Sequence, residues 1–218
     1  MKLIAHRGND NHHEKENHFA AFQASLEKDY IAGIELDVRL TKDKKVVISH
    51  NQLVNTKDGI NALSHMTLKE VRKLTDLDTL EEVLRQLTTN KLIVIEIKHD
   101  GKGYEEINRQ VYRVISQFSS LHFAICSFNY PLIKSFQKKY KKYVVGVIIG
   151  ILANLDHFVN TLNFNSVNFV HYETLDYQKE TFLWTVNRLE EAKKIKKLTN
   201  QVTIITDRAY ALKELLHE

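Results

Sequence analysis

The sequence predicts an α/β fold in which parallel strands alternate with helices and close into a barrel. Short apolar runs alternate with longer amphipathic stretches along the chain, and this alternation is typical of a parallel sheet covered by helices. About eight such units follow one another, as in a closed barrel. No GxGxxG-type loop is present, which favours the barrel over an open doubly wound sheet.

Local patterns predict the individual elements. Strands are expected at 3–5, 34–39, 46–49, 92–98, 122–127, 143–149, 166–170, 181–186 and 202–206. Helices are expected at 67–74, 80–87, 104–118, 131–140, 154–160, 188–198 and 208–217. A further helix is expected after Asn17, a good N-cap residue, because Phe19, Phe22 and Leu26 follow it at helical spacing. The least regular region, 51–79, is expected to form a loop excursion over one end of the barrel.

The connection from Asp37 to Val46 is too short for a helical crossover, which takes about a dozen residues. Its central segment, TKDKK (41–45), looks like a turn. A hairpin folded about Lys42–Lys45 would set Asp37 opposite His50, and an irregular parallel connection is the alternative. The sequence leaves both open.

Length and composition predict a single soluble domain covering residues 1–218. The chain is 43% hydrophobic and 27% charged, with a net charge of +4, as is ordinary for globular domains. It has no signal-peptide pattern and no apolar run near the roughly 18 residues of a membrane span. One cysteine, Cys126 in an apolar run, excludes an internal disulfide and is interpreted as a buried, inert thiol. A cytoplasmic location is therefore expected.

The basic residues are spread out, apart from two lysine clusters at 138–142 and 193–197. Such clusters are usually solvated helix faces, so no nucleic-acid partner is expected. Transient contact with a membrane surface is the minority interpretation. The oligomeric state is left open.

Carboxylates occur on two strands that are otherwise apolar. In GIELDVRL (33–40), side chains alternate, so Glu35 and Asp37 share one face with Arg39. Two acids on a half-apolar strand are costly unless a charge compensates them, and a divalent cation would do so. Glu96 lies near the carboxyl end of LIVIEIKHD (92–100), where active sites of parallel barrels assemble. The alternatives are a polar face on an edge strand and a Glu96–Lys98 surface pair.

Histidines occur where two strands end. His6 and Arg7 follow the first strand and precede Gly8, and His50 ends KVVISH. A His-Arg-Gly corner can present an imidazole and a guanidinium to an anion while glycine lets the backbone approach closely. Together with a carboxylate-bound metal, these groups suit phosphoryl-ester chemistry: Arg and metal neutralise phosphate oxygens, and two histidines take and return protons.

Longer blocks of the sequence resemble the glycerophosphodiester phosphodiesterase family, in the family's order and spacing. These blocks are HRG (6–8), EN and FAAF (16–22), ELDVRLTKDKKVVISHN (35–51), TLEEVL (79–84), IEIK (95–98), SF (127–128), WTVN (184–187) and ITD (205–207). The resemblance implies a TIM-like (β/α)8 barrel, with the short excursion at 51–79 in place of a larger cap. It also implies a Mg²⁺- or Ca²⁺-dependent hydrolase that cleaves glycerophosphodiesters, such as glycerophosphocholine or glycerophosphoethanolamine, to sn-glycerol 3-phosphate and an alcohol.

Carried over position by position, the resemblance implies a role for each site residue. The acid/base pair is His6 and His50, the metal ligands are Glu35, Asp37 and Glu96, and the substrate-binding residues are Arg7, Lys98 and Trp184. Glu16 is expected to orient Arg7 or the metal site, and Phe128 and Asp207 are expected at the rim.

The chain departs from the family pattern in its first loop and beside His50. Lys15 and His18 stand where the family usually has Pro and Thr, and Asn51 stands where it usually has Asp. The third change removes a negative charge, which is expected to lower activity or shift its pH optimum. Two other functions remain open: cleavage of lysophospholipids in the manner of lysophospholipase D, and a non-catalytic barrel that binds phosphodiesters or a partner protein.

Overall fold

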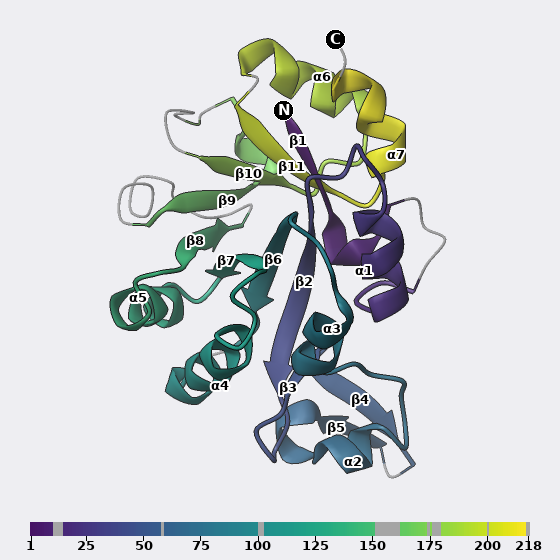
Figure 1. The fold of residues 1–218 in the computed structure, drawn as a ribbon, viewed down its shortest axis with the longest axis vertical. Helices are drawn as coiled ribbons and strands as arrows, with labels where there is room; N and C mark the ends of the chain where they lie inside the picture. The colour runs from purple at the N-terminus through teal and green to yellow at the C-terminus, as the bar shows by residue number, and fades with distance from the viewer. Residues whose placement is uncertain are drawn as a thin grey trace.

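The structure, a computed structural model, describes residues 1–10, 15–57, 59–99, 103–150, 162–173, 175, 180–199 and 201–216. Eight parallel strands are hydrogen-bonded in the order β1-β11-β10-β9-β8-β7-β6-β2, and pairing of β1 with β2 closes the barrel (Figure 1). Their bounds are β1 (Lys2–Ala5), β2 (Gly33–Leu40), β6 (Leu92–Ile97), β7 (His122–Ser127), β8 (Val144–Ile149), β9 (Phe164–Asn168), β10 (Thr181–Trp184) and β11 (Val202–Thr206). The predicted barrel is confirmed, and β9 begins two residues before its predicted start.

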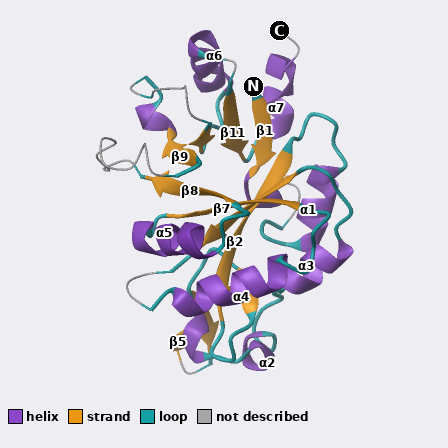
Figure 2. Ribbon diagram, turned by 60° about the vertical axis from the view of Figure 1, so that its left-hand side comes forward, coloured by secondary structure: helices purple, strands orange, loops and turns teal. Residues whose placement is uncertain are grey.

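Helices cover the outside of the barrel (Figure 2). They are α1 (Phe19–Leu26), α3 (Leu80–Gln86), α4 (Glu105–Ile115), α5 (Tyr130–Lys139), α6 (Leu189–Leu198) and α7 (Ala209–Leu212), which continues as the 3-10 helix Lys213–Leu216. Capping interactions explain where two of these helices begin. Thr79 and Glu82 form a reciprocal capping box on α3, and the Asn129 side chain accepts from the Leu132 N–H on α5. The predicted helix at 154–160 lies outside the described residues.

The N-terminus of α1 differs from its prediction. The N-cap is His18, whose ring nitrogen accepts from the Ala20 N–H, and not Asn17. Asn17 instead adopts a left-handed φ of 55°, a conformation that Asn tolerates better than most residues. That conformation leaves the Asn17 amide free to bond elsewhere, as described below.

Alternation along the strands creates two apolar layers. Outward-facing residues such as Leu3, Ile34 and Ile95 pack against the helices, while inward-facing residues fill the barrel. The inner cluster comprises Ile4, Val94, Ala124, Cys126, Ile148, Phe164, Phe182 and Ile205. Gly146 makes room for one of these rings, because a Cβ there would lie 2.3 Å from the Phe164 ring. Apolar side chains thus pack the barrel interior, and the polar side chains of the site lie toward the carboxyl ends of the strands.

The short connection after Asp37 is a hairpin, which excludes the parallel alternative. β3 (Val46–Ile48) runs antiparallel to β2, with Val38 opposite Ile48 and Leu40 opposite Val46. The register differs by one residue from the prediction, because the turn closes between Thr41 and Lys45. Asp37 therefore faces Ser49, whose N–H donates to the Asp37 carbonyl at 3.0 Å. The expectation that Asp37 lies opposite His50 was wrong.

The excursion at 51–79 is more regular than the sequence predicts. It contains a two-stranded sheet, β4 (Leu53–Thr56) and β5 (Gly59–Ala62), the 3-10 turn Leu63–His65 and the short helix α2 (Leu68–Val71). A small apolar cluster anchors it, in which Leu63, Met66 and Val71 pack on Val47 of β3. Figure 1 places it beside the carboxyl end of β2. Among the described residues, no helix combines the length and apolar character needed to cross a bilayer.

Candidate active site

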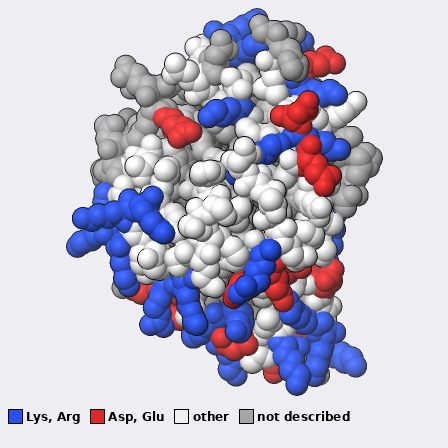
Figure 3. Space-filling model, viewed as in Figure 1, with Lys and Arg blue, Asp and Glu red and all other residues white. Residues whose placement is uncertain are grey.

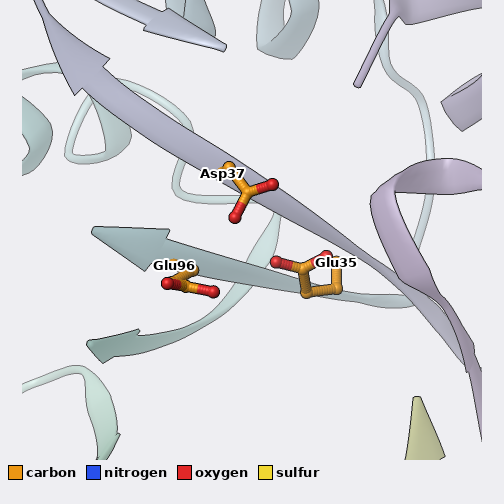
Figure 4. Close-up of side chains that lie close together, drawn as sticks. All are labelled: Glu35, Asp37 and Glu96. Atoms are coloured by element: carbon orange, nitrogen blue, oxygen red, sulfur yellow. The ribbon is translucent and has the colours of Figure 1, made fainter. Parts of the chain in front are cut away.

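Three carboxylates converge inside the barrel. Glu35 and Asp37 lie on β2, and Glu96 lies on β6 directly beside Asp37 in the parallel register. Figure 4 shows the three side chains pointing toward one another from these neighbouring strands. Each offers an oxygen within 4.8 Å of the others, and their exposed fractions are 4%, 1% and 8%. The prediction that Glu35 and Asp37 share one face of their strand is confirmed.

Burial makes the carboxylate cluster electrostatically expensive. Burial, followed by the charges of Asp37 and Glu96, raises the pKa of Glu35 well above its usual range. Burial and the Asp37 charge raise the pKa of Glu96 to about 7. Such a cluster either holds protons or holds a cation. Three carboxylate oxygens at this spacing are hard ligands that fit one divalent cation such as Mg²⁺ or Ca²⁺.

Asp37 is the carboxylate that stays ionised. Burial works against its charge, but Lys98, the Asn17 amide and Arg7 outweigh it and lower its pKa. The Lys98 ammonium lies 3.1 Å from Asp37 Oδ1 and 2.6 Å from Glu96 Oε1. The Arg7 Nε lies 3.3 Å from Asp37 Oδ2. Lys98 therefore lies beside the cluster and pairs with two of its three carboxylates.

Asn17 holds Asp37 with both ends of its amide. Its Nδ2 donates to Asp37 Oδ2 at 2.8 Å, and its Oδ1 accepts from the Asp37 backbone N–H at 3.1 Å. Sequence reasoning missed this role by assigning Asn17 to the helix cap. The available signal was the EN pair (Glu16 and Asn17), which is one of the segments that resemble the family. Its other member, Glu16, accepts a hydrogen bond from the Arg7 guanidinium at 2.8 Å, and a role in orienting Arg7 was expected for it.

His6 and Arg7 lie in the tight turn that follows β1. Arg7 has φ 53° and Gly8 has φ 73°, and a Cβ on Gly8 would lie 2.6 Å from the Phe22 ring. In this turn the backbone N–H of Arg7 donates to Glu35 Oε2 at 3.0 Å, and His6 Nε2 lies 3.9 Å from the same oxygen. The HRG corner thus fits directly onto the carboxylate cluster.

Two polar residues from the segments that follow β10 and β11 stand behind His6. Its Nδ1 lies 2.7 Å from Asp207 Oδ1, and the other oxygen of Asp207 accepts from Asn187 at 2.7 Å. From the sequence, Asp207 was expected only at the rim, and Asn187 had no expected role. Both belong to blocks of the resemblance, WTVN and ITD, so the signal was present.

His50 stands on the other side of the cluster. Burial and the Lys98 charge lower its pKa, although Asp37 and the Asn51 amide act in the opposite direction. Its Nδ1 lies 3.3 Å from the Asn51 side-chain oxygen. Its backbone carbonyl accepts from Arg39 Nε at 3.0 Å, which fixes the end of the hairpin. His50 therefore lies beside a neutral partner where His6 lies beside a carboxylate.

The site residues line one cavity of about 150 Å³. Its ionisable lining residues are His6, Arg7, Glu35, His50, Glu96 and Lys98, beside Cys126, and its remaining lining residues are Phe128, Ile148, Ser166, Trp184, Thr185 and Ile205. Phe128 and Trp184 pack edge-to-face at 5.6 Å. Asp37 lies within the carboxylate cluster, so the structure brings all eight predicted site residues together. Cys126 is buried, as predicted, and burial raises the pKa of its thiol.

A parallel barrel whose strand ends bring two histidines, an arginine and a carboxylate cluster to one cavity defines a hydrolase of phosphate esters. The sequence model of the "Glycerophosphoryl diester phosphodiesterase family" matches residues 6–210. The chain belongs to this family, and it is a phosphoric diester hydrolase of the glycerophosphodiester phosphodiesterase class.

Individual relatives agree in sequence and fold. A glycerophosphodiester phosphodiesterase of Caldanaerobacter subterraneus subsp. tengcongensis is 28% identical, and the match covers 88% of each chain. The crystal structure of the Thermotoga maritima glycerophosphodiester phosphodiesterase is 26% identical, covers 98% of this chain and 97% of its own, and has a TM-score of 0.78. The fold is also shared with an Oleispira antarctica phosphodiesterase solved with the product sn-glycerol-3-phosphate (19% identity, TM-score 0.79, coverage 100% and 97%).

Proposed function

We propose that this chain hydrolyses glycerophosphodiesters, such as glycerophosphocholine or glycerophosphoethanolamine, to sn-glycerol 3-phosphate and an alcohol, with one bound Mg²⁺ or Ca²⁺ and histidine acid/base catalysis. The observation that carries this proposal is the cavity on which His6, His50 and the carboxylate cluster converge. The product bound by the Oleispira antarctica enzyme supports the choice of substrate.

Glu35, Asp37 and Glu96 would hold the cation between β2 and β6. When bound, it would neutralise phosphate oxygens and stabilise the charge that develops on them. Arg7 adds a second cationic group at the cavity, with its guanidinium tied to Glu16 and Asp37. Lys98 holds Asp37 and Glu96 in place and faces the same cavity. These fixed charges orient the phosphodiester before the reaction begins.

The two histidines would move the protons. An attacking hydroxyl, from water or from the substrate's own glycerol, gives its proton to one imidazole as its oxygen bonds to phosphorus. Attack by the glycerol hydroxyl gives a cyclic phosphate, which a water molecule then opens to sn-glycerol 3-phosphate. The bond from phosphorus to the leaving oxygen breaks, and the second imidazole returns a proton to that oxygen. His6 and His50 both line the cavity, so each can reach a bound phosphodiester.

Trp184 and Phe128 would form the wall against which the carbon skeleton of the substrate packs. The two rings lie edge-to-face, and the Lys98 ammonium lies 5.7 Å from the centre of the Phe128 ring. Phe128 is 50% exposed, which gives the lysophospholipid alternative one specific support. An acyl chain has an apolar surface to follow at the mouth of the cavity. Comparing turnover of lysophosphatidylcholine with that of glycerophosphocholine separates the two substrates.

The decisive experiment is release of sn-glycerol 3-phosphate from glycerophosphocholine and glycerophosphoethanolamine by the metal-loaded protein. We expect turnover with Mg²⁺ or Ca²⁺ and a loss of about 10²- to 10⁴-fold in His6→Ala and in His50→Ala. His122→Ala is the matched control, because His122 is exposed at the start of β7 and outside the cavity. No turnover on any glycerophosphodiester would favour a non-catalytic barrel that binds phosphodiesters. The single domain, the cytoplasmic location and transient membrane-surface contact stay predictions.

A further inference from the structure

The barrel closure places a carboxylate behind His6 by strand register. β1 pairs with β11 in parallel, with Ala5 opposite Thr206. The residues that follow, His6 and Asp207, therefore leave the sheet at the same level, and His6 Nδ1 lies 2.7 Å from Asp207 Oδ1. This contact is built into the sheet, 201 residues apart in sequence.

Asn187 fixes the Asp207 carboxylate from behind. Asn187 Oδ1 accepts from the Asp207 N–H at 2.9 Å and from the Thr206 hydroxyl at 3.0 Å. The amide must therefore turn its Nδ2 toward Asp207, to whose Oδ2 it donates at 2.7 Å. Both oxygens of the carboxylate are thus engaged, one by Asn187 and one by His6. Asp207 has little freedom to rotate away from the imidazole.

The chemistry of this pair determines where His6 carries a proton. Burial opposes the charge of Asp207, but its bonds with His6 and Asn187 and the nearby Arg7 lower its pKa. An ionised carboxylate only accepts hydrogen bonds, so the ring nitrogen facing it must donate. Nδ1 then carries a proton whether the ring is neutral or charged. The nitrogen left to react is Nε2, on the side of Glu35.

We propose that Asp207 and Asn187 are positioning residues that lock His6 in the Nδ1–H form and reserve Nε2 for proton transfer to and from the substrate. The inference rests on the proposed role of His6 in the reaction. Neither positioning residue lines the catalytic cavity, so both act through His6 and not on the substrate. The arrangement also makes the two histidines unequal, because His50 Nδ1 faces the amide oxygen of Asn51.

The test is Asp207→Asn, which keeps the shape of the side chain and replaces the acceptor with an amide that can donate. The amide favours the opposite tautomer of His6, with Nδ1 accepting and the proton on Nε2. We expect kcat to fall by roughly 10²- to 10⁴-fold while KM changes little. Asn187→Ala keeps the carboxylate and its acceptor role, so it should retain the tautomer and lose only about 10-fold in kcat.

A spectroscopic readout separates this role from a structural one. In protein labelled with ¹⁵N-histidine at mildly alkaline pH, the ring resonances of His6 are those absent from His6→Ala. The wild-type and Asn187→Ala proteins should show the Nδ1–H form, and Asp207→Asn should show the Nε2–H form. Asp10→Asn is the matched control: Asp10 also binds through both oxygens, to Tyr30 and Tyr210, but touches no cavity residue named above.

Wild-type kcat in folded Asp207→Asn would overturn the inference, and so would an unchanged His6 tautomer in that variant. An Nε2–H form in the wild-type protein would also overturn it. If His6→Ala retains full turnover, the proposed catalytic role of His6 fails instead. The tautomer measurement still decides whether Asp207 locks the ring, because it does not depend on activity.

Discussion

The interior of this barrel has two halves with opposite chemistry. The half built by β1, β2 and β6 presents ionisable groups to the cavity, and the half built by β7 to β10 presents mostly apolar ones. The first comprises His6, Arg7, Glu35, Asp37, Glu96 and Lys98, and the second comprises Ala124, Cys126, Ile148, Phe164, Phe182 and Trp184. On the face of the molecule that Figure 3 shows, both acidic and basic side chains lie at the surface, and the division inside the barrel is not visible there.

The difference teaches how the apolar half conditions the charged one. Burial within the barrel, to which the apolar half contributes, and the neighbouring carboxylate charges raise the pKa of Glu35 and that of Glu96. Because the apolar half excludes solvent, a bound cation or phosphate would interact with fixed charges of the protein and not with water. The charged half therefore supplies the reactive groups, and the apolar half strengthens their electrostatic interactions.

The largest effect is expected from Asp37→Asn, which removes the ionised carboxylate at the centre of the charged half. The variant loses one oxygen charge of the proposed cation site and the partner of Lys98 and Arg7. Turnover should fall about 10³-fold or more, since metal and charge stabilisation supply several kcal/mol. Asp76→Asn is the control, because Asp76 is an exposed carboxylate that pairs with Lys15 and His18. Metal affinity equal to that of the wild type in Asp37→Asn would argue against the assigned ligands.

A second prediction concerns pH and the cation. The pKa of Glu96 is raised from its usual value of about 4.5 to about 7, so its carboxyl holds a proton below that pH. A divalent cation must displace this proton and any proton on Glu35, whose pKa is also raised, so its affinity should rise with pH through about 7. The metal-free protein should behave in the opposite sense, losing the Glu96 contribution to its stability as pH rises from about 4.5 through about 7. Calorimetric titration and thermal unfolding measure the two trends, and a pH-independent affinity would contradict the prediction.

The apolar half is tested by Trp184→Ala. Removing the indole takes away one side of the Phe128–Trp184 wall while leaving every charged group in place. We expect KM for a glycerophosphodiester to rise about 10-fold with a smaller change in kcat, since apolar pocket contacts are worth one to three kcal/mol. Trp184→Phe keeps an aromatic wall and should lie closer to the wild type. A large fall in kcat with unchanged KM would assign Trp184 to the chemistry.

The smallest effect is expected from Asn51→Asp, at the exposed edge of the charged half. A carboxylate at the place of the Asn51 oxygen, 3.3 Å from His50 Nδ1, favours the charged imidazole and raises the pKa of His50. Whichever limb of the pH–rate profile reports His50 should then move to higher pH, by less than about one unit because solvent screens the pair. A shift to lower pH would contradict this account.

Strand pattern predicted the barrel, and strand ends singled out seven of the eight site residues. Trp184 was expected only from the family resemblance. Parity along GIELDVRL placed Glu35 and Asp37 on one face, and the inward direction of that face is confirmed. The hairpin was one of two connections that the sequence left open, and the register expected for it was wrong by one residue, because the turn closes between Thr41 and Lys45. The strands β4 and β5 in 51–79 were missed because such short strands carry little periodic signal, whereas α2 lies within the helix expected at 67–74.

The residues that sequence reasoning missed act through other side chains. Asn17 and Asn187 are neutral amides whose roles depend on which carboxylate lies within reach. The contact of Asp207 with His6 depends on the pairing of β11 with β1, which lie far apart in the sequence. Local patterns do not predict such contacts, because the partners are distant in sequence and only the closed sheet brings them together. The available signal was that each of these residues lies in a segment that resembles the family, namely EN, WTVN or ITD.

The central claim is that the charged half of the barrel works as a phosphodiesterase through a cation held by Glu35, Asp37 and Glu96. Its most direct test is turnover of glycerophosphoethanolamine by metal-free protein as Mg²⁺ or Ca²⁺ is added, above about pH 7 where Glu96 is ionised. We predict negligible release of sn-glycerol 3-phosphate without cation and a saturable rise with it, which Asp37→Asn abolishes. Full turnover by the metal-free protein would contradict the account.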